Sequence, residues 1–383
     1  MSERRPRPRG VLALATVSLL ILAGCTPAEP EFLTLPTGQP QSPPAATPNV
    51  PGDTRGALRP SGDPVSLVSG LAAPWSVVPL PVGSTLVSER DTARVLEHTE
   101  GGDVSVVGTV PGVVPEGEGG LLGLAAHDEG TAYLYAYVTT GGDNRILRFE
   151  LLGDPGSYEL GASEEVLTGI PRSRTHNGGR LAFGPDGMLY ATTGDAGRPA
   201  LSQDPASLAG KILRLTPEGA VPADNPTAGS YVFSLGHRNP QGIAFDRTGQ
   251  LWAAEFGQNT WDELNRIEPG ANYGWPDVEG VGGRDGFVDP VQQWTTSDAS
   301  PSGLGIVGDT LVLASLRGQR LWLVDIDDPG SSTAVYVGDY GRLRDALAGP
   351  DGTLWFLTNN TDGRGSPRGS DDHLYSVPLL PRD

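Results

Sequence analysis

Residues 184–190 read GPDGMLY, a tight-turn signal that leads into a strand beginning with a leucine and an aromatic residue. The same phrase recurs as DRTGQLW at 246–252 and as GPDGTLW at 349–355, with weaker relatives VGSTLV near 82 and VGDTLV near 307. Short apolar runs alternate with turns along the chain, and no long stretch with a period of 3.6 residues interrupts them. A recurring unit of turn and strand indicates an all-β repeat fold.

The length of the repeat region predicts the number of units. About 315 residues follow Val65, and at roughly 40–50 residues per unit they make six or seven blades of a β-propeller over residues 65–383. The alternative is a pair of β-sandwiches, which rarely repeat one phrase in this way. Loops from several blades converge at one end of a propeller channel, so we expect functional residues at scattered positions next to strands.

The N-terminal 64 residues have a different composition. Residues 1–24 combine an arginine-rich start with the apolar run VLALATVSLLILAG, which is typical of a secretory signal peptide. The ending LAGC resembles a bacterial lipobox, in which Cys25 would be lipidated; the alternative is an ordinary signal peptide with an incidental cysteine. Residues 25–64, rich in Pro, Thr, Gly and Ala, are predicted to be a tether. We expect an exported protein, lipid-anchored to the membrane and facing the periplasm or the cell exterior.

The overall composition excludes several classes of function. The net charge of −19 repels nucleic acid and anionic membrane surfaces, so the lipid anchor is the only membrane contact we expect. Cys25 is the only cysteine, which leaves no disulfide, zinc-thiolate site or cysteine nucleophile in the rest of the chain. A GxGxxG match at 303–308 is interpreted as a turn, because ASPS precedes it and the strand-like TLVLASL follows it.

Residues 174–197, RTHNGGRLAFGPDGMLYATTGDAG, contain a candidate general base. A hairpin about the GPDG turn would bring His176 and Asp195 together at one edge of a sheet. A histidine beside a carboxylate is the minimum requirement for a general base. The glycine-rich loop THNGG at 175–179 is predicted to expose His176, although a lone histidine is more often structural.

A second candidate segment reads SLGHRNPQG at 234–242. His237, Arg238, Asn239 and Gln241 are four strongly hydrogen-bonding side chains within five positions. Such density suits recognition of a polar, oxygen-rich ligand. The alternative is a salt-bridged turn between blades.

Arginines near the C-terminus predict a site for carboxylates. In GRLRD at 341–345, Arg342 and Arg344 lie on the same face of an extended segment, and Arg317 supplies a third cation. Two guanidinium groups that face one way can clamp a carboxylate. Each arginine taken alone could equally serve surface solubility.

The segment AEFGQNTWDELNRIEPGANYGW at 254–275 predicts a cation site. It places Glu255, Asp262 and Glu263 among loop glycines and backbone carbonyls. Calcium prefers six to eight oxygen ligands of these kinds. The alternative is a solvated acidic loop.

These motifs together resemble those of a known family. THNGGRLAFGPDG, TTGDAG, GKILRL, GHRNPQG, the AEFG–DELN–NYGWP series and GRLRD occur in this order in soluble quinoprotein sugar dehydrogenases. From about residue 70 to its end, the chain resembles the glucose/sorbosone dehydrogenase family, in its aldose sugar dehydrogenase branch. The resemblance implies a six-bladed β-propeller that binds pyrroloquinoline quinone (PQQ) with Ca²⁺.

The resemblance also implies roles for individual residues. His176 would take the proton of the C1 hydroxyl of an aldose while the C1 hydride passes to C5 of the quinone and the lactone forms, with Asp195 orienting His176 and Arg238 facing the quinone oxygen. The implied cofactor-binding residues are Arg238, Asn239, Gln241, Arg317, Arg342 and Arg344. The implied calcium ligands are the carbonyls of Gly257 and Gln258 at the PQQ calcium, and Glu263 with the Tyr273 carbonyl at a second site.

The chain departs from the family pattern at three positions near the implied site. Arg317 stands where a lysine is common, Gln258 replaces a proline, and Glu118 stands where a glutamine near the sugar is usual. An anionic side chain at 118 would alter the choice of substrate or add a second base. The alternatives to an aldose dehydrogenase with an unknown electron acceptor are a non-catalytic ligand-binding propeller and a calcium-dependent hydrolase of the lactonase type.

Overall fold

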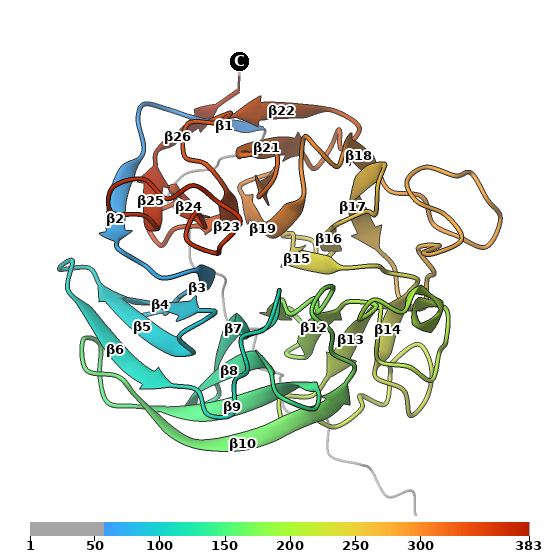
Figure 1. Ribbon diagram of the computed structural model, residues 1–383, viewed down its shortest axis with the longest axis horizontal. Helices are drawn as coiled ribbons and strands as arrows, with labels where there is room; N and C mark the ends of the chain where they lie inside the picture. Colours follow the sequence, from blue (N-terminus) through green and yellow to red (C-terminus); the bar gives the residue numbers. More distant parts are fainter. Residues whose placement is uncertain (1–56, 383) are drawn as a thin grey trace, which may run out of the picture. The chain divides into compact units, whose positions relative to one another are not determined.

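The computed structural model describes residues 57–382, which fold into a six-bladed β-propeller (Figure 1). Each blade is an antiparallel sheet of four strands, so the prediction of an all-β propeller is confirmed and the number of blades is six. Within the described range the one helical element is the 3-10 helix η1 (Pro199–Ser202). No helix in residues 57–382 is long and apolar enough to cross a bilayer.

The first three blades are each built from four consecutive strands. Blade 1 contains β3 (Pro74–Pro79), β4 (Ser84–Glu89), β5 (Arg94–Thr99) and β6 (Val104–Thr109). Blade 2 contains β7 (Leu121–Asp128), β8 (Ala132–Thr139), β9 (Asn144–Leu152) and β10 (Glu159–Ile170). Blade 3 contains β11 (Leu181–Phe183), β12 (Leu189–Thr193), β13 (Lys211–Leu215) and β14 (Val232–Leu235).

The next two blades follow the same order, and the sixth closes the ring. Blade 4 contains β15 (Pro240–Phe245), β16 (Leu251–Glu255), β17 (Trp261–Ile267) and β18 (Gln292–Thr295). Blade 5 contains β19 (Pro301–Val307), β20 (Thr310–Ser315), β21 (Arg320–Asp325) and β22 (Ser332–Val335). Blade 6 contains β23 (Leu343–Ala348), β24 (Leu354–Thr358), β25 (His373–Val377) and β2 (Val65–Ser69).

Both ends of the described chain take part in this closure. Strand β2 pairs with β25, so blade 6 contains the N-terminal part of the propeller together with its last strands. Strand β1 (Leu58–Pro60) also pairs with β26 (Leu379–Pro381). This strand lies inside the segment 25–64 that we predicted to be a tether. The predicted signal peptide, Cys25 and the tether up to residue 56 lie outside the described residues.

The repeated phrase occupies the same place in every blade that contains it, the turn between the first and second strands. In blades 3, 4 and 6 this turn contains Asp186, Asp246 and Asp351, and each carboxylate accepts the backbone N–H two residues later. The related phrases VGSTLV and VGDTLV form the corresponding turns of blades 1 and 5. An aspartate that hydrogen-bonds its own turn explains why the phrase recurs.

Each blade buries its second strand between the two neighbouring blades. All residues of β4, β12, β16, β20 and β24 are buried, and all of these strands except β4 are apolar over most of their length. One core cluster, for example, joins Tyr135 and Ile146 of blade 2 to Leu189 and Leu213 of blade 3. Burial of each large apolar side chain stabilises the fold by about 1.5–3 kcal/mol. The blades therefore form a rigid frame for the loops at their ends.

The first strands of neighbouring blades contact one another around the central channel. In blades 1, 2, 4, 5 and 6 the pairing of the first and second strands is interrupted by a register shift close to the start of the first strand. Bulges of this kind redirect side chains and are frequent next to active sites. Here they occur at the end of the propeller that carries the predicted site residues.

Candidate active site

A cavity of about 300 Å³ opens where the first strands begin and the second strands finish. All six blades contribute side chains to its wall. The lining residues are Arg90, Glu118, His176, Arg238, Asn239, Gln241, Phe256, Gly257, Ser300, Leu316, Arg317, Arg342, Arg344 and Arg364. Six arginines thus share the wall with one carboxylate, that of Glu118, and this excess of positive charge suits an anionic ligand.

The hairpin of β11 and β12 brings the predicted base and its partner together. Nδ1 of His176 lies 2.7 Å from Oδ1 of Asp195, and its Nε2 lies 2.9 Å from Nη2 of Arg238. Because an arginine side chain only donates hydrogen bonds, Nε2 accepts, and the proton of the neutral imidazole is on Nδ1. A histidine with an unprotonated Nε2 at the cavity wall is in the state that a general base requires.

The backbone of His176 is held in an unusual conformation. Its φ is 58°, in the left-handed region that costs free energy for a residue with a side chain. Two hydrogen bonds hold it there: the His176 N–H donates to Oε2 of Glu118 at 2.8 Å, and the His176 carbonyl accepts the N–H of Ala196 at 3.1 Å. Glu118 therefore contacts the predicted base directly.

The rest of the loop does not have the exposure that we predicted from its glycines. Residues 177–180 are buried. The N–H of Gly178 donates to the Asn239 side chain at 3.0 Å, and Gly179 approaches Leu122 too closely to carry a Cβ. The prediction of an exposed loop is wrong for this part because the glycines serve close packing against blade 2, and the His176 side chain alone reaches the cavity.

Asp195 is buried and fully engaged as an acceptor. Its Oδ2 accepts the indole N–H of Trp275 at 3.0 Å, and its Oδ1 accepts the N–H of Gly197 at 2.7 Å in addition to His176. Burial by itself raises the pKa of Asp195, but the hydrogen bonds from His176, Trp275 and Gly197 together hold that pKa below its ordinary value. Asp195 therefore remains a carboxylate at neutral pH and fixes the proton on Nδ1.

Arg238 is a largely buried cation beside the histidine. Its Nη1 donates to the carbonyl of Phe256 at 3.2 Å, and its backbone N–H donates to the Glu255 carboxylate. Burial lowers the pKa of Arg238, against the opposing effects of Asp195 and Glu255. A guanidinium nevertheless stays protonated at neutral pH. Arg238 is thus a fixed positive charge at the cavity wall.

His237 behaves differently from its neighbours Arg238, Asn239 and Gln241, which line the cavity. It is fully buried, with Nδ1 2.8 Å from Oε2 of Glu255 and Nε2 2.8 Å from Oγ of Ser234. The sequence predicted that His237 would help to bind a ligand, and this prediction is wrong because the side chain is enclosed by Glu255 and Ser234. Through Glu255 it supports the backbone of Arg238 instead.

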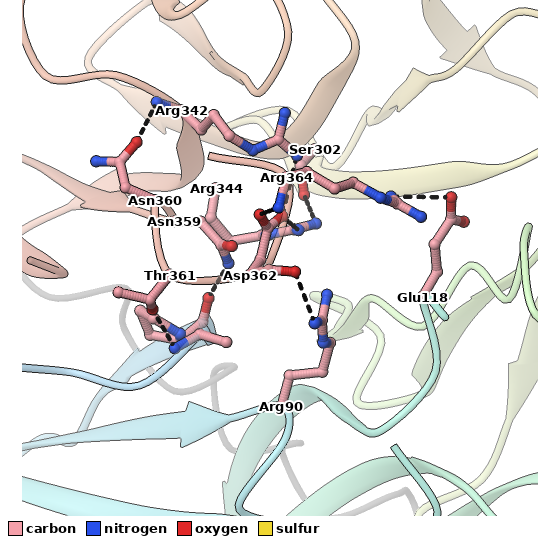
Figure 2. A network of polar contacts seen from close by, with 12 residues as sticks. Arg90, Glu118, Ser302, Arg342, Arg344, Asn359, Asn360, Thr361, Asp362 and Arg364 are labelled. Carbon is pink, nitrogen blue, oxygen red and sulfur yellow. Dashed lines mark hydrogen bonds and ion pairs between the residues drawn. The ribbon is translucent and has the colours of Figure 1, made fainter. Parts of the chain in front are cut away.

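Two of the predicted arginines are fixed by a buried carboxylate (Figure 2). Oδ2 of Asp362 lies 3.0 Å from Nη2 of Arg342 and 3.7 Å from Nη2 of Arg344. Arg344 also donates to Gln241 at 3.1 Å and to Ser302 at 3.2 Å. Burial raises the pKa of Asp362, but Arg344 and Arg342 outweigh this effect and hold it below its ordinary value. Both guanidinium groups are therefore in place before any ligand arrives.

Several donors in this wall have no acceptor. The Nε atoms of Arg238, Arg342 and Arg344 are buried and unpaired among the described residues, and Arg317 makes no hydrogen bond or ion pair within residues 57–382. Buried polar groups normally find partners. Unpaired guanidinium donors around one cavity fit a ligand that carries several carboxylates.

The loop after β16 begins at the same cavity, where Phe256 and Gly257 belong to the wall. One carboxylate oxygen, Oε1 of Glu279, accepts four consecutive backbone N–H groups, those of Gln258, Asn259, Thr260 and Trp261, at 2.7, 3.0, 3.0 and 3.2 Å. The N–H of Gly257 donates to Asp262 at 2.9 Å. The carbonyls of Gly257 and Gln258 accept no hydrogen bond from the described residues. Free carbonyl oxygens on a clamped loop fit a hard cation such as calcium.

A second, smaller cavity of about 10 Å³ lies behind this loop, with Glu255, Glu263, Tyr273 and Glu279 in its wall. Glu255 and Glu263 are buried and lie opposite each other in the pairing of β16 with β17. Burial, followed by the charge of Glu255, raises the pKa of Glu263 to about 8. Two buried carboxylates beside a space of this size fit one cation. In residues 57–382 no three His, Cys, Asp or Glu side chains are grouped to hold a metal, so backbone oxygens would have to complete the ligand set.

Comparison with known proteins identifies the family. The model of the Glucose / Sorbosone dehydrogenase family matches residues 71–367. The chain belongs to the glucose/sorbosone dehydrogenase family. This confirms the resemblance seen in the sequence motifs.

Three known proteins are similar to this glucose/sorbosone dehydrogenase over most of its propeller. The PQQ-bound structure of the aldose sugar dehydrogenase from Streptomyces coelicolor is 46% identical, covers 87% of this chain and 100% of that one, and has a TM-score of 0.81. Quinoprotein glucose dehydrogenase B of Acinetobacter calcoaceticus is 33% identical over 64% of this chain and 58% of its own length. Aldose sugar dehydrogenase YliI of Escherichia coli is 29% identical over 76% of this chain and 88% of its own length.

Most predicted site residues of this family member converge as expected. Of the predicted catalytic, cofactor-binding and substrate residues, all line the main cavity except Asp195, which lies directly behind His176. Sequence patterns did not predict five further residues at or behind the cavity: Arg90, Arg364, Asp362, Trp275 and Glu279. A signal for the first two was present: Arg90 directly follows β4, and Arg364 belongs to the segment after β24, the same place in the blade as Asp195 after β12.

Proposed function

We propose that this protein is a PQQ- and calcium-dependent dehydrogenase that oxidises the C1 hydroxyl of aldose sugars to the lactone. The observation that carries the proposal is the contact of His176 with both Asp195 and Arg238 at the wall of an arginine-lined cavity. The relatives support it, since their names and structures describe quinoprotein, PQQ-bound and aldose sugar dehydrogenases.

The arginine-rich wall would hold the cofactor. Arg317, Arg342 and Arg344 would bind the carboxylates of PQQ through the donors that lack partners among the described residues. Asn239 and Gln241 line the same wall, and Arg238 would face the oxygen on which negative charge develops. When bound, the quinone supplies the acceptor for the hydrogen and the two electrons that leave C1 of the sugar.

The oxygen-rich loop would hold calcium. The carbonyls of Gly257 and Gln258 accept no hydrogen bond from the described residues and are suitable ligands. Gly257 lines the main cavity, and Gln258 follows it on the loop that Glu279 holds. Glu263 and the carbonyl of Tyr273 are suitable ligands at the smaller cavity. Calcium would polarise the bound quinone and would neutralise the paired carboxylates of Glu255 and Glu263.

The residues of this chain would remove the hydroxyl proton. The C1 hydroxyl of the sugar takes the place of Arg238 as the hydrogen-bond donor to Nε2 of His176, and the proton moves to Nε2 as the C1 carbonyl forms. The imidazolium then carries a proton on each nitrogen, and the Asp195 carboxylate stabilises its charge through Nδ1–H at 2.7 Å. Before substrate enters, the guanidinium of Arg238 donates the hydrogen bond that Nε2 accepts.

Addition of PQQ and Ca²⁺ to the protein tests this function. We expect a saturable change in PQQ absorbance and oxidation of D-glucose or another aldose with an artificial electron acceptor. A protein that binds PQQ but oxidises no aldose would support the non-catalytic ligand-binding propeller. Hydrolysis of lactones with calcium and without quinone would support the lactonase alternative.

We also propose that the protein is exported and anchored by a lipid on Cys25, as its N-terminal sequence predicts. The full chain expressed in a bacterium should partition with the membrane fraction and incorporate labelled fatty acid. Cys25→Ser should remove both properties. Equal labelling of the two proteins would contradict the anchor.

A further inference from the structure

An ion pair joins two distant segments at the wall of the main cavity (Figure 2). Oε1 of Glu118, in the segment before β7 of blade 2, lies 3.2 Å from Nη1 of Arg364, in the segment after β24 of blade 6. The other oxygen, Oε2, accepts the backbone N–H of His176 at 2.8 Å. Glu118 and Arg364 both line the cavity that contains His176, so a sugar bound at the base lies within reach of this pair.

Both carboxylate oxygens of Glu118 accept hydrogen bonds, one from Arg364 and one from the His176 N–H. A glutamine at this position could not accept both. A glutamine has one acceptor oxygen and one amide nitrogen that only donates. It could keep the bond to the His176 N–H, but it would then release Arg364. The carboxylate at 118 and the guanidinium at 364 therefore depend on each other.

The charges around the cavity determine which ligands it attracts. Arg90 is held by Asp91 at 2.7 and 3.0 Å and by the carbonyl of Asp362 at 3.3 Å. Under the proposed function, the cofactor carboxylates occupy Arg317, Arg342 and Arg344, and Arg238 faces the quinone. Arg364 is the one remaining cation, and Glu118 neutralises it. A loaded cavity therefore has no free positive charge for the substrate.

We propose that Glu118 and Arg364 form a specificity-determining pair that restricts the site to uncharged sugars. Glu118 repels an anionic sugar and at the same time occupies the cation that would attract one. An anionic sugar would lose hydration at this wall and find no free cation in return, whereas a neutral sugar needs no counter-charge. This proposal rests on the proposed function and names the substrate class of the same site.

Three variants test the pair with D-glucose and D-glucuronate, an anionic aldose with the same reacting hydroxyl. Glu118→Gln frees Arg364, so the ratio of kcat/KM for glucose to kcat/KM for glucuronate should fall about tenfold, equivalent to ~1.4 kcal/mol. Arg364→Gln leaves the carboxylate unpaired, so the ratio should rise by a similar factor. The double variant should return close to the wild-type ratio, because neither charge remains.

Glu116→Gln is the matched control. Glu116 lies in the same loop, pairs with Arg172 at 2.6 Å and Arg174 at 2.7 Å, and does not line the cavity. The Glu116→Gln change should loosen the loop but leave the ratio of kcat/KM for glucose to kcat/KM for glucuronate unchanged. A ratio that stays within twofold of wild type in both single variants, or that moves equally in Glu116→Gln, would overturn the proposal.

A binding measurement separates this proposal from the proposed function. Calorimetric titration of glucuronate into the protein supplied with PQQ and Ca²⁺ needs no turnover, and Glu118→Gln should bind it about tenfold more tightly than wild type. If no sugar is oxidised, the proposed function fails, yet this difference in affinity still supports the charge pair. Equal affinity in the two proteins overturns the pair even if glucose is oxidised normally.

Discussion

Nη2 of Arg238 lies 2.9 Å from Nε2 of His176, and this contact sets the hydrogen-bonding roles of the two ring nitrogens. Since the guanidinium can only donate, Nε2 must accept, and Nδ1 carries the proton that Asp195 binds at 2.7 Å. Under the proposed function, the same cation would face the quinone oxygen on which negative charge develops as the cofactor is reduced. One arginine would thus orient the base and stabilise the charge that the transfer creates.

Asp195→Asn should disable the base. Both oxygens of Asp195 accept hydrogen bonds, Oδ1 from His176 and Gly197 and Oδ2 from Trp275. An asparagine must turn its NH₂ group toward one of these donors, which disturbs the tautomer of His176. We expect kcat for aldose oxidation to fall by about 10²–10⁴-fold. PQQ affinity, measured by absorbance titration, should stay near the wild-type value; a kcat within threefold of wild type would contradict the role of Asp195.

The same carboxylate should contribute to stability in a pH-dependent way. Its pKa in the folded protein lies below its ordinary value, so it stabilises the fold above the unfolded pKa of about 3.9 and this contribution is lost as the pH falls through the folded pKa. Urea unfolding of wild type and Asp195→Asn should show a difference in unfolding free energy that is constant near neutral pH and narrows below about pH 4. A difference that does not change between pH 7 and pH 3 would show that Asp195 is not the titrating group.

Asp362→Asn should make the stability of the protein depend on bound anions. The change leaves Arg342 and the buried Arg344 without their carboxylate, and loss of one partner of a buried pair costs about 3–5 kcal/mol. The melting temperature should therefore fall, and PQQ should raise it more than it raises that of wild type. Asp351→Asn, in a turn of the same blade, is the control and should show the wild-type response to PQQ. An unchanged melting temperature for Asp362→Asn would contradict this account.

Glu279 should act on calcium affinity through the loop that it clamps. Glu279→Gln keeps an acceptor oxygen for the four N–H groups, whereas Glu279→Ala removes it. We expect the alanine variant to need about tenfold more Ca²⁺ for half-maximal thermal stabilisation, and the glutamine variant to stay closer to wild type. If the two variants respond alike, the charge of Glu279, and not its hydrogen bonds, governs the site.

Local patterns in the sequence predicted the fold and the central pair. The turn phrase recurs because the same aspartate turn joins the first two strands of several blades. His176 and Asp195 are 19 residues apart on the two outer ends of one hairpin, so their contact followed from the turn between them. The sequence was therefore sufficient to predict a contact between residues of the same hairpin.

Contacts between blades could not be predicted in this way. Glu118 and Arg364 are 246 residues apart and meet because the ring closes through the pairing of β2 with β25. Burial could not be predicted from local sequence either. His237 is as polar as its cavity-lining neighbours, but it is buried and hydrogen-bonded to Glu255 and Ser234. Several residues follow the second strand of each blade. Which of them face the cavity depends on how the six blades are arranged around the channel.

The most direct test of the central claim is a single-turnover measurement on His176. Wild type and His176→Asn are loaded with PQQ and Ca²⁺, mixed with an aldose without an electron acceptor, and followed by the absorbance of the quinone. The account predicts rapid reduction of the quinone in wild type and reduction about 10²–10⁴-fold slower in His176→Asn, with equal PQQ loading. Equal rates of reduction in the two loaded proteins would contradict the assignment of His176 as the base.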